Sequence, residues 1–323
     1  MSLIVSNLSK KYDTKTVVDK LNFEIAKPGV YALLGTNGAG KTTSIRMILG
    51  MLAKDSGEVL WNGKPFSLDT CNVGYLAEER GLYPKYSLLD QLIYFAELRG
   101  LKKAEAEKRI SYWAERLEVS EYIYPMPALV QNLAGIAPSS RTKTKKQMKA
   151  DQLSKGNQQK IQLMVTLLSD PELLILDEPL SGLDPVNTDL FKSIIREEIN
   201  KGKYLIMSSH QMATVEEFCT DMTILSRSKT ALQGNLNEIK KSYGRVNLSL
   251  KTEQDVTALI TASGARLVTS KENEYEIKVD GEKQANALLG ALVQSGITIV
   301  TFDLREPSLH EIFVETVGGA EDE

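Results

Sequence analysis

The sequence predicts an α/β fold with a parallel sheet, followed by a small α+β domain. Three observations support this prediction. Short, continuous apolar runs occur at 30–34, 173–176 and 204–207, as expected of parallel strands that are buried on both faces. A glycine-rich stretch, 35–43, lies between the first of these runs and a helical pattern. Residues 246–304 show strand and helix patterns in the order βαββαβ, which is typical of a ferredoxin-like domain.

The strand and helix patterns divide the chain into two predicted domains, 1–240 and 241–323. The first domain opens with a hairpin-like pattern over about 25 residues. Amphipathic helical patterns from about 85 to 165 predict a helical subdomain within it. The composition changes near 240, around the segment KKSYGR, and a last helix is expected at 308–316.

The composition is that of an ordinary globular protein of about two domains. The chain has 323 residues, a formal net charge of −3 and 42% hydrophobic residues. Domains that mainly bind nucleic acid are usually basic, so no nucleic-acid partner is expected. Two cysteines, Cys71 and Cys219, exclude a disulfide scaffold and fit a reducing compartment. No signal peptide and no run of about 18 apolar residues occurs, so we expect a cytoplasmic chain that does not span a bilayer alone.

The glycine-rich stretch matches the phosphate-binding pattern G-x-x-x-x-G-K-[ST]. Backbone N–H groups must curl around phosphate oxygens, and side chains at Gly38 or Gly40 would block that approach. Lys41 is expected to reach the β- and γ-phosphates, and the Thr42 hydroxyl is a suitable ligand for Mg²⁺. The position between strand and helix disfavours the alternative, a glycine-rich turn with a solvated lysine. The expected ATP-binding residues here are Gly35, Thr36, Asn37, Gly38, Ala39, Gly40, Lys41, Thr42 and Thr43.

Two acids, Asp177 and Glu178, follow the apolar run at 173–176. Placed beside a phosphate loop, Asp177 would hold Mg²⁺ directly or through water. Glu178 would then polarise the attacking water as a general base. The alternative is a strand that simply ends in solvated acids, and the phosphate loop upstream makes this alternative much weaker.

With these motifs in place, the chain resembles the nucleotide-binding subunit of ABC transporters over roughly residues 1–240. The motifs occur in the order of that family, and their conjunction is more specific than any single one. The matching segments are the adenine-stacking position Tyr12, the Q-loop region GYLAEERGLYP (74–84), the signature-like LSKGNQQK (153–160), the D-loop SGLDP (181–185) and the switch histidine His210.

The resemblance implies a P-loop NTPase fold of the ABC type, in which two subunits enclose two ATP molecules. Ser154 and Gly156 would contact the γ-phosphate bound to the partner subunit, and Asp184 would link the two sites. His210 would bond the γ-phosphate and keep Glu178 and the water aligned. The expected catalytic residues are therefore Glu178, His210 and Lys41.

Some positions depart from the family pattern. Lys155 and Asn157 replace the usual Gly and Gln of the signature, and Lys160 replaces the usual Arg. Glu78 stands at the Q-loop position that is usually Gln, and is the expected Mg²⁺ ligand there. The intact phosphate-loop lysine, strand-end acids and switch histidine argue for an active enzyme.

The layout is most similar to ATPases of sodium- or antibiotic-efflux systems. The resemblance implies an ATP-hydrolysing subunit that powers a separate multi-spanning permease, which exports an ion, drug or peptide. It also implies a second ATPase subunit, in a homodimer, and a position on the inner face of the cell membrane. Two alternatives remain: a non-transport ABC ATPase of iron–sulfur assembly, DNA repair or translation, and a regulatory ATP-binding module.

One segment, about 125–149, has no counterpart in the family pattern. An uncharged, proline-broken stretch at 122–140 precedes five basic residues within 141–149. A solvated surface loop is the simpler interpretation. The alternative is contact with an anionic membrane surface or with the membrane partner.

Overall fold

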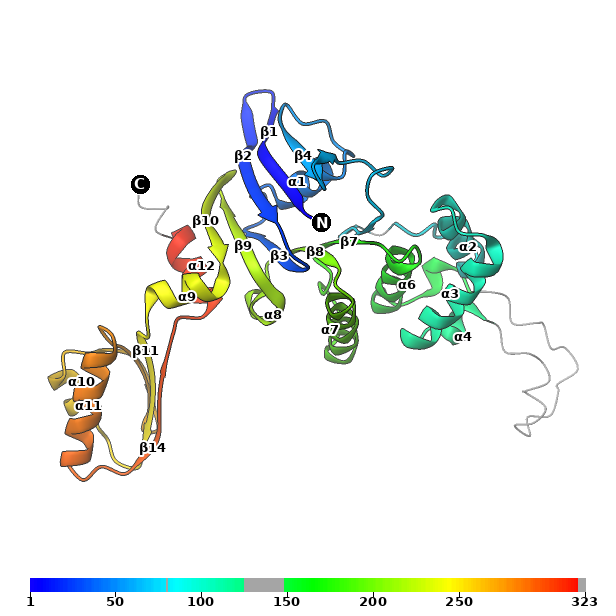
Figure 1. Cartoon of the computed structure of the whole chain (residues 1–323). Helices are drawn as coiled ribbons and strands as arrows, with labels where there is room; N and C mark the ends of the chain where they lie inside the picture. Colours follow the sequence, from blue (N-terminus) through cyan, green and yellow to red (C-terminus); the bar gives the residue numbers. More distant parts are fainter. Residues whose placement is uncertain (80, 125–147, 319–323) are drawn as a thin grey trace, which may run out of the picture. The chain divides into compact units, whose positions relative to one another are not determined.

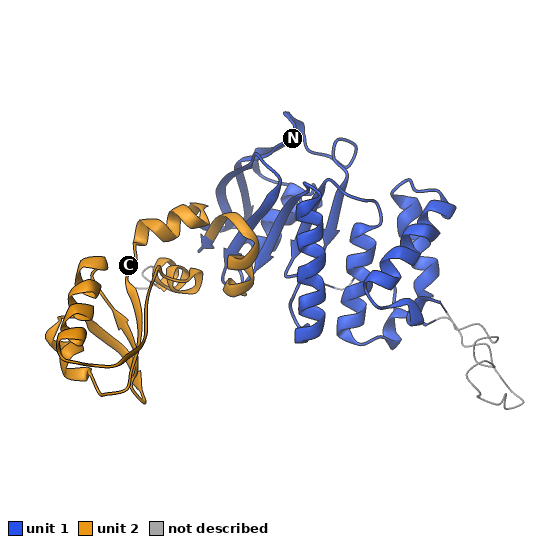
Figure 2. Cartoon of the chain, turned by 60° about the horizontal axis from the view of Figure 1, so that its bottom comes forward, with its two compact units in different colours: residues 1–210, 225–230 blue, residues 211–224, 231–323 orange. Residues whose placement is uncertain are grey.

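The computed structural model describes residues 1–79, 81–124 and 148–318. The chain divides into two compact units (Figure 2). Unit 1 comprises Met1–His210 and Leu225–Thr230, and unit 2 comprises Gln211–Ile224 and Ala231–Glu323. The expected domain boundary near 240 stays a prediction. The segment at 125–149 lies outside the described residues, apart from its last two positions.

The first sheet of unit 1 is antiparallel, with the strand order β2-β1-β4-β5. The predicted hairpin is present, with Leu3 opposite Ile25 and Tyr12 opposite Lys15. Every second side chain is buried at the start of β1, as expected of a strand with one face on the core. The strands are β1 (Leu3–Tyr12), β2 (Lys15–Ile25), β4 (Ser56–Trp61) and β5 (Lys64–Pro65).

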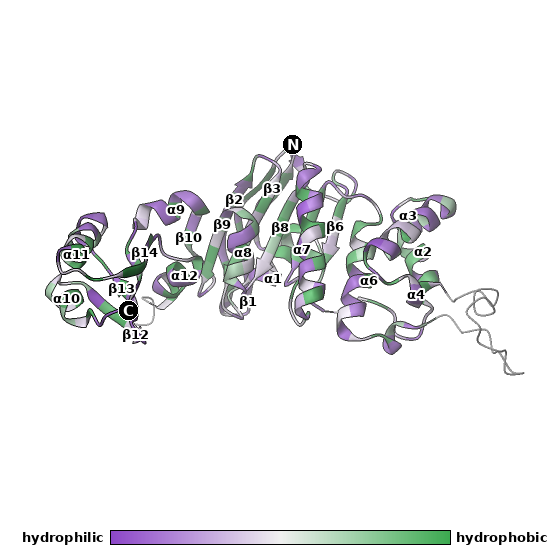
Figure 3. Cartoon of the chain, turned by 90° about the horizontal axis from the view of Figure 1, so that it is seen from below, coloured by the Kyte–Doolittle hydropathy of each residue, from purple (hydrophilic) through white to green (hydrophobic). Residues whose placement is uncertain are grey.

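The second sheet carries the three predicted apolar runs as parallel strands, and its order is β10-β9-β3-β8-β7-β6. All residues of β7 and β8 are buried, which explains why their sequences lack alternation, and these strands are mostly hydrophobic in Figure 3. The register places Asp177 opposite Ser208, and Leu34 opposite Ser209. The strands are β3 (Gly29–Gly35), β6 (Val73–Leu76), β7 (Leu173–Asp177), β8 (Tyr204–Ser209), β9 (Cys219–Ser226) and β10 (Lys229–Asn235).

The helices of unit 1 fall into two groups. Helices α2, α3 and α4 pack on one another, and α2 and α3 also contact α6, as the predicted helical subdomain requires (Figure 1). Helices α1 and α7 follow the carboxyl ends of β3 and β7. The bounds are α1 (Lys41–Ile48), α2 (Leu88–Leu98), α3 (Lys103–Arg116), α4 (Ser120–Ile123), the 3₁₀ turn η1 (Ala150–Gln152), α6 (Lys155–Leu167) and α7 (Pro185–Asn200).

Unit 2 contains the predicted βαββαβ domain. Its four strands are antiparallel in the order β12-β13-β11-β14, which is the ferredoxin-like topology. Helices α10 and α11 cover one face through a core that includes Leu250, Tyr275 and Leu288. The elements are β11 (Asn247–Thr252), α10 (Thr257–Ala262), β12 (Arg266–Lys271), β13 (Glu274–Lys278), α11 (Glu282–Gln294) and β14 (Ile299–Arg305). Three further helices are α8 (Met212–Phe218), α9 (Leu236–Tyr243) and α12 (Leu309–Gly318). Among the helices of the described residues, none combines the length and the apolar character needed to cross a membrane.

Candidate active site

The glycine-rich loop lies between β3 and α1, where the sequence predicts it. The Nζ atom of Lys41 donates to the carbonyl oxygens of Gly35 (2.9 Å) and Thr36 (3.3 Å), and the residue is only 7% exposed. Gly40 has a φ of +107°, and a Cβ there would lie 2.5 Å from the carbonyl oxygen of Val17 in β2. Only glycine fits that position, because both the backbone conformation and the close approach exclude a side chain. At Gly38 a Cβ would meet no atom within 4 Å, so that side of the loop is open.

The carboxylate of Asp177 is buried at the end of β7. Asp177 is 1% exposed, and its Oδ1 accepts a hydrogen bond from the Ser208 hydroxyl on the neighbouring strand. Within the described residues, Oδ2 is a buried oxygen that has no hydrogen-bond partner. Because buried polar atoms are nearly always partnered, this oxygen is suited to receive a ligand.

Glu178 is held in a strained conformation next to that acid. Its φ of +49° lies in the left-handed region, which costs a residue with a side chain about 1–2 kcal/mol. Its backbone N–H donates to both the carbonyl oxygen (3.1 Å) and the hydroxyl (3.2 Å) of Ser208, and these bonds fix the conformation. Strain of this kind is typical of functional sites.

The side chain of Glu178 contacts the other two predicted catalytic residues. Its Oε2 lies 2.8 Å from Nδ1 of His210 and accepts a weaker hydrogen bond from the backbone N–H of His210 at 3.4 Å. Its Oε1 lies 4.0 Å from Nζ of Lys41. The side chain of Glu178 is 6% exposed and that of His210 is 55% exposed, so the acid is buried beside an exposed histidine. A carboxylate oriented in this way can accept a proton from a water molecule.

These residues surround a cavity of about 370 Å³. Its walls come from the phosphate loop and the start of α1, from β2, from the segment after β6, and from the residues that follow β7 and β8. The lining residues are Val17, Asn37, Gly38, Gly40, Lys41, Thr42, Thr43, Glu78, Glu178 and His210. The structure thus brings together most of the residues that the motifs predict for one nucleotide site. Gly35, Thr36 and Ala39 lie in the same loop but do not line the cavity, and neither does Asp177 at the end of β7.

Tyr12 does not line the cavity either. It ends β1, is 47% exposed and has Nζ of Lys10 at 5.4 Å from its ring centre. It pairs with Lys15, at the start of the strand that carries Val17 to the cavity. Its stacking on adenine stays a prediction.

Three predicted residues form a separate group at the start of α6 and α7. Ser154 and Asp184 are the N-cap residues, and accept hydrogen bonds from the N–H groups of Asn157 (3.3 Å) and Asn187 (2.9 Å). The backbone N–H of Asn187 lowers the pKa of Asp184 below its ordinary value. A Cβ on Gly156 would lie 3.3 Å from Nδ2 of the Asn187 side chain. None of the three lines the cavity of the same chain.

The donor set of the cavity fits Mg²⁺. Thr42 and Glu78 line it, and Asp177 has a buried oxygen that lacks a partner in the described part of the chain. These are hard oxygen donors of the kind that Mg²⁺ prefers. In the described ranges, no group of three or more His, Cys, Asp or Glu residues suited to a metal occurs.

The sequence did not indicate three contributors to this site. Val17 lines the cavity, and the Ser208 hydroxyl donates to the Asp177 carboxylate and accepts from the backbone N–H of Glu178. Gln159 of α6 donates to the carbonyl oxygen of Pro179 at 2.6 Å, and so links the signature-like helix to the residue after Glu178. A serine at the end of an otherwise apolar strand is a signal that could have identified Ser208.

Comparisons with known proteins agree with this geometry. Residues 18–181 match the family model of the ABC transporter, and residues 234–317 match the C-terminal domain of DrrA1-3-like ATP-binding proteins. A solved structure described as the ATP binding subunit of an ABC transporter superimposes with a TM-score of 0.63 at 27% identity, and covers 75% of this chain and 93% of its own.

Curated relatives match over most of their length. The uncharacterized ABC transporter ATP-binding protein YhaQ of Bacillus subtilis is 39% identical over 98% of both chains. The linearmycin resistance ATP-binding protein LnrL of the same species is 27% identical over 98% of both. The Nod factor export ATP-binding protein I of Sinorhizobium fredii is 26% identical over 98% of this chain and 86% of its own.

Proposed function

The chain belongs to the family of ABC transporter ATP-binding proteins, and from this membership we propose that it powers a separate permease that exports an ion, drug or peptide. The chain binds ATP, and its ATPase reaction is coupled to transport. Two relatives are named for linearmycin resistance and for Nod factor export, and these names support the direction of transport. We propose that the subunit sits on the cytoplasmic face of the cell membrane.

The observation that carries the catalytic assignment is the contact of Glu178 with His210. At 2.8 Å from Oε2 the histidine orients the carboxylate, and Lys41 at 4.0 Å places positive charge near the other oxygen, Oε1. We assign Glu178 as the general base for water, Lys41 as the cation at the β- and γ-phosphates, and His210 as the group that aligns base and γ-phosphate. Glycine-loop N–H groups at the start of α1 would hold the phosphates.

Mg²⁺ is the proposed metal. Asp177, Thr42 and Glu78 would hold it, and when bound it would neutralise charge on the β- and γ-phosphates. Ser208 donates a hydrogen bond to Oδ1 of Asp177, so Oδ2 is the oxygen that would bind the metal.

A second copy of the chain would complete each site. The exposed N-termini of α6 and α7 carry Ser154, Gly156 and Asp184, and helix N-termini attract anions. Because these residues lie away from the cavity of their own chain, we propose that they act on the γ-phosphate held by the partner subunit.

An exposed aromatic surface on the helical subdomain supports a protein partner. Tyr83, Tyr86, Tyr94 and Leu98 are 47–65% exposed at α2 and just before it. The three tyrosines line a groove of about 480 Å³. Aromatic surfaces of this kind mark protein–protein contacts, and we propose the permease as the occupant. Membrane contact through 125–149 stays a prediction.

The test is reconstitution with a candidate permease, a multi-spanning membrane protein sought among the open reading frames next to the gene of this chain. The two proteins are co-expressed, purified in detergent and placed in phospholipid vesicles, and ATPase activity and ATP-driven uptake are measured. The double substitution Tyr86→Ser/Tyr94→Ser should abolish co-purification and leave the ATPase activity of the free subunit unchanged. Tyr112→Ser, at a tyrosine of α3 that is 53% exposed, is the matched control. It should retain both co-purification and the ATPase activity of the free subunit. Absence of ATP-driven uptake by the intact pair would contradict the transport function and favour a non-transport ABC ATPase.

A further inference from the structure

Helix α8 follows the candidate active site directly along the chain. It begins two residues after His210, whose ring contacts Glu178. The division into compact units falls between His210 and Gln211, so α8 groups with the C-terminal unit. A single residue, Gln211, therefore separates His210 from the start of α8 in the sequence.

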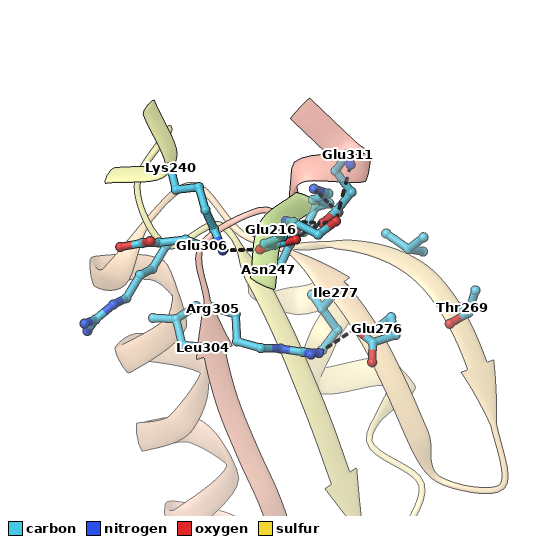
Figure 4. Close-up of a pocket in the computed structure, with 14 residues that line it drawn as sticks. Glu216, Lys240, Asn247, Thr269, Glu276, Ile277, Leu304, Arg305, Glu306 and Glu311 are labelled. Atoms are coloured by element: carbon cyan, nitrogen blue, oxygen red, sulfur yellow. Dashed lines mark hydrogen bonds and ion pairs between the residues drawn. The ribbon is translucent and has the colours of Figure 1, made fainter. Parts of the chain in front are cut away.

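Glu216 is the residue of α8 that ties it to other parts of unit 2. Its Oε1 accepts from Nζ of Lys240 on α9 at 2.5 Å, and its Oε2 accepts from the backbone N–H of Leu309 at 3.1 Å. The side chains of Glu216 and Lys240 are 27% and 21% exposed, so the ion pair is partly shielded from solvent. Figure 4 shows the Lys240 side chain reaching Glu216, with Glu311 and Asn247 beside it.

The start of α12, where Leu309 donates to Glu216, is itself bonded to the ferredoxin-like sheet. Ser308 and Glu311 cap α12 reciprocally: the N–H of Ser308 donates to Oε2 of Glu311 (2.9 Å), and the N–H of Glu311 donates to Oγ of Ser308 (3.3 Å). Glu311 also accepts from Nδ2 of Asn247 in β11 (2.9 Å) and from Nζ of Lys278 in β13 (3.0 Å). A chain of polar contacts thus runs from α8 through α12 to the sheet.

We propose that Glu216 is a positioning residue for ATP hydrolysis, which holds α8 on the C-terminal domain and thereby keeps His210 in contact with Glu178. Helix α8 has only seven residues, and helices this short depend on tertiary contacts for their position. The proposal rests on the role of His210 proposed above. It gives the C-terminal domain a function, since that domain supports the histidine that aligns the base.

The test uses the full chain and compares Glu216→Gln with Glu276→Gln. Glu276 of β13 pairs with Arg305 of β14 at 3.6 Å, within the ferredoxin-like sheet and away from α8, so its substitution is the matched control. We expect Glu216→Gln to lower kcat about tenfold, because small displacements of aligned groups reduce rates strongly. The KM for ATP should stay unchanged, since the phosphate loop is intact. Lys240→Met, which removes the ion pair from the other side, should lower kcat in the same direction.

The second arm repeats Glu216→Gln in a His210→Ala chain, with all rates measured well below every melting temperature. If Glu216 acts through His210, Glu216→Gln should cause no further loss of kcat in that background. Two results would overturn this proposal and leave the role of His210 intact. One is that the kcat losses of the two substitutions add in the double variant. The other is that Glu216→Gln has the parental kcat while His210→Ala is impaired. A parental kcat in His210→Ala would overturn the proposed role of His210, and this proposal with it.

Discussion

Removal of the Ser208 hydroxyl tests how the site holds its buried acid. Ser208 is fully buried, and its Oγ donates to Oδ1 of Asp177, which is 1% exposed. In the described residues, the other oxygen of Asp177 has no hydrogen-bond partner. Ser208→Ala therefore leaves this carboxylate without the hydrogen bond that it receives from Ser208.

The expected cost follows from this contact. A hydrogen bond to a charged group contributes about 1.5–3 kcal/mol to stability. The N–H of Glu178 loses little, because it keeps the carbonyl oxygen of Ser208 at 3.1 Å. We therefore expect the free energy of unfolding to fall by about 2 kcal/mol, or about 4–8 °C in melting temperature for a unit of this size.

Equilibrium unfolding in urea at pH 7 measures the effect. Both tryptophans, Trp61 and Trp113, lie in unit 1, so their fluorescence reports on the unit that contains Ser208. Ser56→Ala, at an exposed serine of β4 in the same unit, is the control and should be neutral. A loss below about 0.5 kcal/mol in Ser208→Ala would refute the assigned hydrogen bond.

Two further predictions concern backbone and charge. Gly40→Ala should lower the melting temperature more than Gly50→Ala. Both glycines have a positive φ, but a Cβ on Gly50 would meet open space, whereas a Cβ on Gly40 would lie 2.5 Å from the Val17 carbonyl oxygen. Equal shifts would contradict the close approach. Burial raises the pKa of Glu311, but hydrogen bonds from the Ser308 backbone, Lys278 and the Ser308 hydroxyl outweigh it and lower the pKa from 4.5 to about 2. The stabilisation by Glu311 is therefore complete above pH 4.5 and is lost as the pH falls towards 2. The difference in unfolding free energy between the parent and Glu311→Gln should shrink over that range. A constant difference would argue against the lowered pKa of Glu311.

The parallel strands and the phosphate loop could be predicted because their signals are local. Strands β3, β7 and β8 are buried on both faces, and such strands read as short continuous apolar runs. The βαββαβ order of unit 2 likewise followed from alternating patterns, and the strand order confirms it.

Other features depend on pairings that no local pattern encodes. Strand β4 was not predicted, because the first half of Ser56–Trp61 is exposed and its place is set by pairing with β1, about 50 residues away in the sequence. The partnership of Ser208 with Asp177 depends on parallel register, which a single sequence does not show. The seven residues of α8 are too few for a clear helical period.

The substitution Glu178→Gln tests whether Glu178 is the general base that activates water for ATP hydrolysis. Single-turnover hydrolysis of radiolabelled ATP is followed in the parent, in Glu178→Gln and in Glu172→Gln, an exposed glutamate just before β7. We expect Glu178→Gln to retain bound ATP in a stable dimer and to hydrolyse it at least about 100-fold more slowly, while Glu172→Gln matches the parent. Hydrolysis by Glu178→Gln at the parental rate would contradict the assignment of Glu178 as the general base.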